Sequence, residues 1–154
     1  MKPRIYIDTS IMGGFFDQEF SMATQALFER LKKGEIVFVV SDVLDKELLR
    51  APAHVRNLLD SYDANSLEHV ALTQESIDLA NRYIAEKVVG GASIDDCYHI
   101  ATATIAKVDV LASWNFKHIV NLDRIKGYNG VNLKMGYSII EIRNPKDLIS
   151  YGND

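Results

Sequence analysis

Short apolar runs alternate along the chain with longer stretches in which apolar residues recur every three or four positions. Three runs are short and aliphatic-rich and therefore predict buried strands: Arg4 to Asp8, Ile36 to Ser41 and Val108 to Ser113. A shorter strand is expected over Ser138 to Ile142. The longer stretches predict helices over 21–33, 41–50, 53–62, 74–89 and 93–107. Strands separated by helices indicate parallel pairing, so we expect an α/β fold.

No internal repeat, low-complexity tract or Pro- or Ser-rich linker divides the chain, so we expect one domain over residues 1–154. The glycine-rich zone Gly127 to Gly136 is interpreted as a surface loop. The pairs Gly13-Gly14 and Gly90-Gly91 lack the spacing of phosphate-binding loops. Enzymes that use a nucleotide cofactor are therefore disfavoured.

Length and composition are those of an ordinary globular domain, with 154 residues, 47% hydrophobic and 25% charged. These fractions exclude the disordered, collagenous and coiled-coil classes. The longest unbroken aliphatic and aromatic run, Ile36 to Val40, is far below the roughly 18 residues that span a bilayer, so no membrane association is expected. Met1 to Asp8 reaches an acid before a signal-peptide core develops, and the single Cys97 forbids an intrachain disulfide. We expect a cytoplasmic protein.

The charge balance bears on possible substrates. Seventeen basic and twenty-one acidic residues give a formal net charge of −4, which argues against binding a polyanion through bulk charge. A nucleic-acid substrate would need the help of a bound cation.

Asp8 directly follows the apolar run Ile5 to Ile7. In an open parallel sheet, ligands bind at the carboxyl ends of strands, which makes Asp8 a candidate site residue. The alternative is that Asp8, Thr9 or Ser10 caps the following helix, because short oxygen-bearing side chains accept hydrogen bonds from free amides there.

Glu47 falls in an apolar stripe with Val43, Leu44 and Leu48. A carboxylate facing inward is costly unless it is protonated, paired or bound to a cation. The alternative is a position at the rim of the stripe, where Glu47 reaches solvent or Arg50.

Asp96 shares a helix face with Ile100 and Ala103 and is the third candidate acid. It also fits a capping box, with Ser93 as the N-cap and Asp96 at the third helical position. Asp95 is expected to stabilise the same first turn through the helix dipole. His99, three residues after Asp96, could contact the same site, and we expect it to support the acids rather than to react.

Asn115 follows the third long strand, after Ser113 and Trp114. Its amide oxygen could ligate a hard cation or hold a metal-bound water, or it could cap the short turn 116–118. If the strands share one sheet, Asp8, Glu47, Asp96 and Asn115 converge at its carboxyl edge. Oxygen donors without a cysteine or histidine cluster favour Mg²⁺ or Mn²⁺ over zinc.

Four segments, 5–10, 41–48, 96–103 and 111–116, together resemble the PIN-domain family, in particular its VapC-like toxin branch. Each motif is weak alone, but the order and spacing of the four are fairly specific. The resemblance extends from about Arg4 to Asn144-Pro145, nearly the whole chain.

The resemblance implies a three-layer α/β/α sandwich with a mainly parallel sheet and a ribonuclease site that uses Mg²⁺ or Mn²⁺. Asp8, Glu47 and Asp96 match the three core acids of the family and would hold the metal. Asn115 stands where many members carry a fourth acid, which leaves a second metal in doubt. Further residues match supporting positions beside the acids: Thr9 and Ser113.

The leading hypothesis is a metal-dependent endoribonuclease, the toxin of a type II toxin–antitoxin pair. The resemblance implies an RNA substrate, a small antitoxin partner and a homodimer. Candidate contacts to the RNA backbone are Lys117, His118, Arg50 and Lys126, although solvated surface charge is the simpler interpretation of each. The alternative hypothesis is a non-catalytic PIN-like module that binds RNA or protein. Asn115 favours this alternative, and the three retained acids oppose it.

Overall fold

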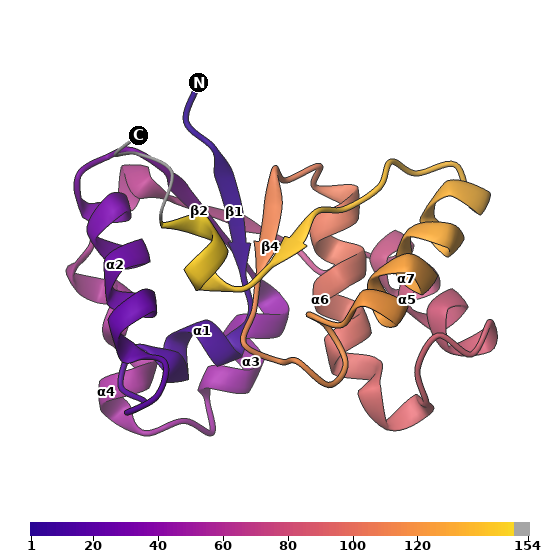
Figure 1. Ribbon diagram of the computed structural model, residues 1–154, viewed down its shortest axis with the longest axis horizontal. Coiled ribbons are helices and arrows are strands. Elements are labelled where there is room, and N and C mark those ends of the chain that lie inside the picture. Colours follow the sequence, from indigo (N-terminus) through magenta and orange to yellow (C-terminus); the bar gives the residue numbers. More distant parts are fainter. Residues whose placement is uncertain (150–154) are drawn as a thin grey trace.

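A five-stranded, all-parallel sheet forms the centre of the molecule, in the order β3-β2-β1-β4-β5 (Figure 1). The computed structural model describes residues 1–149. The strands are β1 (Arg4–Ile7), β2 (Val37–Ser41), β3 (Leu67–Val70), β4 (Val110–Ala112) and β5 (Ile142–Arg143). In the register, Ile5 of β1 lies between Phe38 of β2 and Val110 of β4. The predicted parallel α/β sheet is confirmed.

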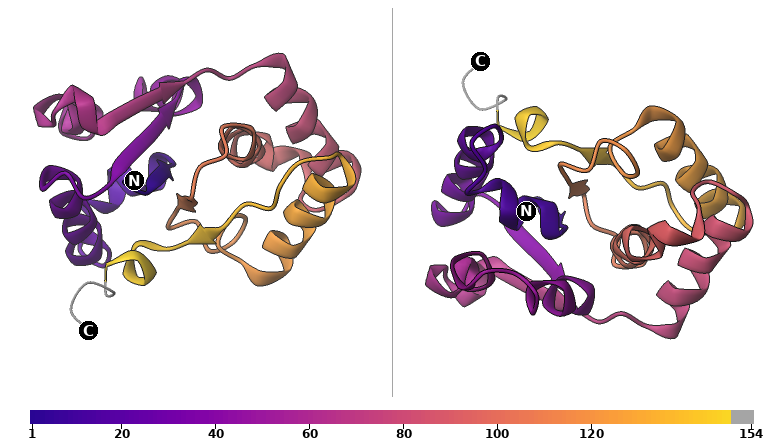
Figure 2. Two further views of the ribbon diagram at one scale, coloured as in Figure 1. Left: turned by 90° about the horizontal axis from the view of Figure 1, so that it is seen from above. Right: turned by 90° about the horizontal axis from the view of Figure 1, so that it is seen from below.

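Helices cover both faces of this sheet (Figure 1). The helices are α1 (Thr9–Gly14), α2 (Ser21–Lys32), α3 (Asp42–Leu48), α4 (Ala53–Arg56), α5 (Gln74–Ala85), α6 (Ile94–Ile105) and α7 (Leu122–Lys134). Short 3₁₀ turns are η1 (Leu58–Ser61), η2 (Ala64–Ser66), η3 (Gly91–Ser93) and η4 (Pro145–Leu148). The views along the strands separate the side of α2 and α4 from the side of α5 and α7 (Figure 2). The three-layer sandwich is therefore as expected.

Alternating side chains of β1 divide the interior into two cores. Ile5 and Ile7 belong to the core on the α2 side, whereas Tyr6 belongs to the core on the α6 side. This alternation follows from the period of two in an extended strand. A fully buried central strand explains why the sequence shows a continuous apolar run there.

The glycine-rich zone is helical, so the prediction of a surface loop over 127–136 is wrong. α7 runs through it from Leu122 to Lys134, and the Asn121 side chain caps the helix by accepting from the backbone N–H of Arg124. A Cβ atom at Gly127 would lie 2.7 Å from Val88 Cγ1. Gly127 therefore lets α7 pack closely against Val88, and this packing outweighs the low helix propensity of glycine.

Three smaller differences concern one strand that was not predicted and the boundaries of two other elements. β3 was not predicted, because as an edge strand it is only half-buried and carries no continuous apolar run. The helix expected over 53–62 is divided into α4 and η1, and the last strand lies at 142–143 rather than 138–142. Within residues 1–149, no helix combines the length and apolarity that crossing a bilayer requires.

Candidate active site

Asp8 lies directly after β1 and is almost completely buried, at 3% exposure. Its Oδ1 accepts from Ser10 Oγ (2.6 Å) and from the N–H of Ile11 (3.3 Å), and its Oδ2 accepts from Ser113 Oγ (2.6 Å). Asp8 thus caps α1 while its carboxylate faces the end of β4. Burial raises the pKa of Asp8, against the positive charge of His99 and these hydrogen bonds.

The loop after β4 is hydrogen-bonded to Asp8 through the hydroxyl groups of two serines, Ser10 and Ser113. Ser10 Oγ accepts from the N–H of Trp114 (2.8 Å), and Ser113 Oγ accepts from the N–H of Asn115 (2.9 Å). Ser113 thus touches Asp8 directly, and its supporting role stays a prediction. These contacts join the carboxyl ends of two neighbouring strands.

Glu47 lies in the last turn of α3, with its side chain 32% exposed. Its Oε1 accepts from Thr9 Oγ1 (2.8 Å) and lies 2.5 Å from His99 Nε2. Burial opposes ionisation of Glu47, but the hydrogen bond and charge of His99 and the hydrogen bond of Thr9 hold its pKa below the ordinary value. Glu47 is therefore ionised at neutral pH, and its partner is His99 rather than Arg50.

Asp96 lies in the first turn of α6 and is half-buried. Burial raises its pKa, the negative charges of Asp8 and Glu47 raise it further, and His99 and His118 oppose this. Asp96 is thus affected by the charges of both other predicted acids.

The predicted capping box at the start of α6 is not formed. Ser93 occupies the N-cap position, but its side chain makes no capping hydrogen bond. A 3₁₀ turn, η3, leads directly into α6 and gives Ser93 a backbone conformation outside the extended region of a typical N-cap. In the described part of the chain, no donor hydrogen-bonds the Asp96 carboxylate, which leaves its oxygens available to a ligand.

Asn115 caps the turn that follows it. Its Oδ1 accepts from the N–H of Lys117 (3.2 Å) and of His118 (3.0 Å). The capping alternative is thus what the structure shows, and a role in ligating a cation stays a prediction.

The acids fit a hard divalent cation by their chemistry. Among residues 1–149, no lysine or arginine forms a salt bridge with Asp8, Glu47 or Asp96. Carboxylates that are removed from water, that repel one another and that lack a lysine or arginine partner gain stability from Mg²⁺ or Mn²⁺. The residues that could hold the ion are Asp8, Asp96 and one oxygen of Glu47; the ligand atoms of these three residues do not all lie within 4.8 Å of one another in this structure.

No protein-family model and no curated protein sequence matches this chain. Solved structures do. A chain of VapBC2 from Rickettsia felis, crystallised with a promoter DNA fragment, matches with a TM-score of 0.59 and 14% identity, covering 92% of this chain and 98% of that one. FitAcB from Neisseria gonorrhoeae gives 0.57 and 12%, with 92% and 98% covered. VapC20 of Mycobacterium tuberculosis, a sarcin-ricin loop cleaving toxin, gives 0.53 and 12%, with 73% and 91% covered.

The chain has a VapC-like PIN-domain fold. The likeness covers nearly the whole sheet and its helices, although the identities are low. What the likeness establishes is the fold, on which the acids above are arranged at the carboxyl edge.

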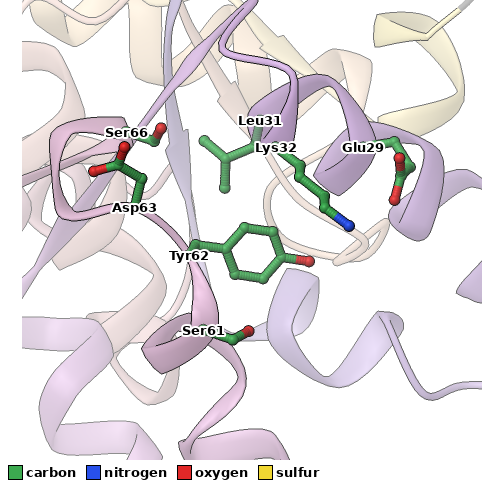
Figure 3. Close-up of a pocket in the computed structure, with 7 residues that line it drawn as sticks. All are labelled: Glu29, Leu31, Lys32, Ser61, Tyr62, Asp63 and Ser66. Atoms are coloured by element: carbon green, nitrogen blue, oxygen red, sulfur yellow. The ribbon is translucent and has the colours of Figure 1, made fainter.

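Two hollows mark the surface of this VapC-like fold at different places. A groove of about 620 Å³ adjoins the acids and shares Thr9 and Glu47 with them; Lys46, Arg50 and Tyr98 also line it. A smaller hollow of about 330 Å³ lies between α2 and the η1–η2 segment, where Lys32 and Glu29 lie across from Tyr62 (Figure 3). Of these two, only the first is lined by one of the three acids, Glu47.

A second group of potential ligands lies at the surface between α3 and β3. His69 Nε2 is 2.8 Å from Asp45 Oδ2 and 3.3 Å from Asp42 Oδ1. Within residues 1–149, this is the one group of three such side chains whose ligand atoms all lie within 4.8 Å of one another. All three residues are exposed, and the contacts are those of a surface histidine beside two acids.

Sequence reasoning missed Tyr6 and Ser41, which contact the candidate site from the sheet. The Tyr6 hydroxyl lies 2.6 Å from both Ser41 Oγ and His99 Nδ1. A signal existed in the single hydroxyl of the apolar run Ile5 to Ile7, but its partners depend on the pairing of β1 with β2.

Proposed function

We propose that this protein is an endoribonuclease that depends on Mg²⁺ or Mn²⁺ and acts as the toxin of a toxin–antitoxin pair. One observation carries the proposal: at the carboxyl edge of a VapC-like sheet the charges of Asp8 and Glu47 act on Asp96, and within residues 1–149 no lysine or arginine forms a salt bridge with any of the three acids. VapC20, which shares the fold, is a sarcin-ricin loop cleaving toxin.

The side chains around the acids would serve hydrolysis of a phosphodiester. A bound Mg²⁺ or Mn²⁺ would offset the phosphate charge and lower the pKa of a water molecule. Asp8, held by Ser10 and Ser113, and Asp96, without a hydrogen bond among the described residues, would be its ligands. Glu47 would contribute its ionised carboxylate directly or through water.

The RNA would lie along the groove beside Glu47. Lys46 and Arg50 are exposed on this groove and would contact phosphates, while Tyr98 offers an aromatic surface for a base. Because single-stranded RNA can place unstacked bases on such surfaces, we propose a loop or unpaired segment as the substrate.

We propose a small antitoxin as the protein partner and a homodimer as the assembled state, in the cytoplasm. VapBC2 and FitAB, which share the fold, were crystallised as complexes. Large apolar side chains on this chain are exposed, including Leu49 at 74%, which lines the groove beside Glu47, and Phe116 at 47%. Such surfaces are typical of contacts with a protein partner.

A non-catalytic module is the second candidate function, because Asn115 provides no fourth carboxylate and its amide oxygen is used as a cap. Such a protein would bind RNA or an antitoxin without cutting.

A nuclease assay with a chelator separates the two functions. Purified protein is incubated with mixed RNA and Mg²⁺ or Mn²⁺, with and without EDTA. We expect cleavage that EDTA abolishes and that Asp8→Asn and Asp96→Asn each reduce by at least about 100-fold, because removal of a metal ligand removes its charge from the site. Asp60→Asn, an exposed acid in η1, is the matched control and should cut normally.

Cleavage that persists in EDTA would contradict the metal mechanism. Absence of cleavage with retained RNA binding would favour the non-catalytic module. Growth arrest on expression, relieved by the product of a small neighbouring reading frame, would support the toxin assignment.

A further inference from the structure

A continuous chain of buried polar side chains leads from the centre of the sheet to Glu47. It consists of Ser41 at the end of β2, Tyr6 in β1 and His99 in α6, which are 0%, 0% and 2% exposed. The three contacts that join them to Glu47 measure 2.6, 2.6 and 2.5 Å. Side chains from β2, β1 and α6 are thus linked in series, and the last of them, His99, contacts the Glu47 carboxylate.

Donors and acceptors can be assigned consistently along these hydrogen-bonded side chains. Ser41 Oγ accepts from the N–H of Val43 (3.2 Å), so its own proton can be donated to the Tyr6 oxygen. The Tyr6 hydroxyl then donates to His99 Nδ1, and His99 Nε2–H donates to Glu47 Oε1. Each buried polar atom has a hydrogen-bond partner both in this arrangement and with a charged His99, whose Nδ1–H would donate to the Tyr6 oxygen.

This row of hydrogen-bonded side chains determines which oxygen of Glu47 is held. Oε1 receives two donors, Thr9 Oγ1 and His99 Nε2, whereas no donor within residues 1–149 contacts Oε2. Two donors therefore hold the carboxylate at Oε1, and this fixes the direction in which Oε2 points.

A purely structural role explains this arrangement less well. An apolar trio could fill the same space, and burying three hydroxyl and imidazole groups is costly unless each is paired. The neighbouring residues of Tyr6 in β1, Ile5 and Ile7, are apolar. Side chains that orient a ligand through its second atom are a recurrent feature of metal sites.

We propose that Tyr6 and His99 are positioning residues that hold Glu47 by Oε1, so that Glu47 meets the metal or its water through Oε2 alone. This inference rests on the proposed function. It assigns a role to Tyr6, which neither the motifs nor the resemblance singled out.

The test compares two buried tyrosines. Tyr6→Phe removes only the hydroxyl that fixes His99, and Tyr83→Phe removes a hydroxyl that donates to Asn132 Oδ1 at 2.5 Å, with no bond to Glu47. Both are 0% exposed and belong to the same core. Binding of Mn²⁺ to the protein is measured by electron paramagnetic resonance, beside thermal unfolding and the kcat and KM of RNA cleavage.

We expect Tyr6→Phe to weaken Mn²⁺ binding and to lower kcat by about 10-fold each with KM unchanged, as is usual for loss of an orienting partner. Tyr83→Phe should lose similar thermal stability but bind Mn²⁺ normally. His99→Gln, which retains a donor, should keep more Mn²⁺ affinity than His99→Leu.

Equal Mn²⁺ affinities for wild type, Tyr6→Phe and Tyr83→Phe would overturn the inference while leaving the proposed function intact. If Tyr6→Phe fails to fold, the two His99 variants decide, and equal Mn²⁺ affinity in both overturns the inference. A wild-type protein that neither binds Mn²⁺ nor cuts RNA would overturn the proposed function and the inference together.

Discussion

Asp95 and Asp96 are neighbours in the first turn of α6, yet their surroundings differ. Asp95 is exposed, where a negative charge is favoured by the helix dipole. Asp96 is half-buried and faces the charges of Asp8 and Glu47. Asp95 therefore stabilises the helix, whereas Asp96 is destabilised by burial and by nearby negative charges, which a bound cation would offset.

We therefore expect Asp96→Asn to stabilise the metal-free protein at neutral pH. The gain is about 0.5 kcal/mol, because solvent still reaches Asp96 and screens the repulsion. Asp95→Asn, the matched control, should be neutral or slightly destabilising. Unfolding by urea in the presence of EDTA measures both.

The pH dependence of the Asp96→Asn effect has a defined sign. The pKa of Asp96 is raised in the folded state, so the folded protein binds more protons than the unfolded chain above the ordinary value of 3.8. Wild-type stability is therefore lost as the pH rises from about 4 through the folded pKa. The advantage of Asp96→Asn should grow over that interval, and an advantage that shrinks with rising pH would contradict this account.

Single residues could be predicted from the sequence where their role depends on neighbours in the chain. Asp8 was expected at a strand end, with capping by Asp8, Thr9 or Ser10 as the alternative to a site role; the structure places Asp8 directly after β1 and as the N-cap of α1. Tyr6 and Ser41 could not be paired in advance, because their contact depends on strand register and on α6 packing against the sheet.

At the level of elements, α7 shows how packing decides a segment whose sequence is ambiguous. Gly127 and Gly130 lie in the same helix, but only Gly127 is close to a neighbouring side chain. A Cβ atom added at Gly127 would lie 2.7 Å from Val88 Cγ1, whereas a Cβ atom added at Gly130 would have no neighbouring atom within 4 Å. Glycine frequency predicted a loop, whereas the structure uses one glycine for close approach.

Gly127→Ala should destabilise the protein by about 1–3 kcal/mol, because Val88 is β-branched and cannot easily move aside. Gly130→Ala, the control in the same helix, should stabilise by up to about 1 kcal/mol through helix propensity. Thermal unfolding of both variants gives the comparison. Adding Val88→Ala should recover part of the loss at Gly127, and a stabilising Gly127→Ala would show that the contact is not restrictive.

The central strands were predictable because burial on both faces produces continuous apolar runs. β3 was not, because it lies at the sheet edge and its side chains are only partly covered. The same contrast applies to the site: the place of Asp8 at a strand end could be predicted from the sequence, whereas the hydrogen bonds between elements could not.

For the whole molecule, the net charge has the same sign as that of the proposed RNA substrate. The chain carries a formal net charge of −4, so long-range attraction of RNA is weak. Lys46 and Arg50 on the groove beside Glu47 therefore have to provide local phosphate contacts. Lys32 provides a comparison, because it is an exposed cation on the separate hollow between α2 and the η1–η2 segment (Figure 3).

We expect the double variant Lys46→Ala/Arg50→Ala to raise the KM for RNA several-fold with little change in kcat, because the contacts hold substrate and transition state alike. Its affinity should also depend less on salt, with a slope smaller by about 0.7 for each lost contact to a single strand. Lys32→Ala should change neither quantity. Binding of RNA to the Asp8→Asn protein at several salt concentrations measures the slope without cleavage. Equal salt slopes for the parent and the double variant would place the RNA elsewhere on the surface.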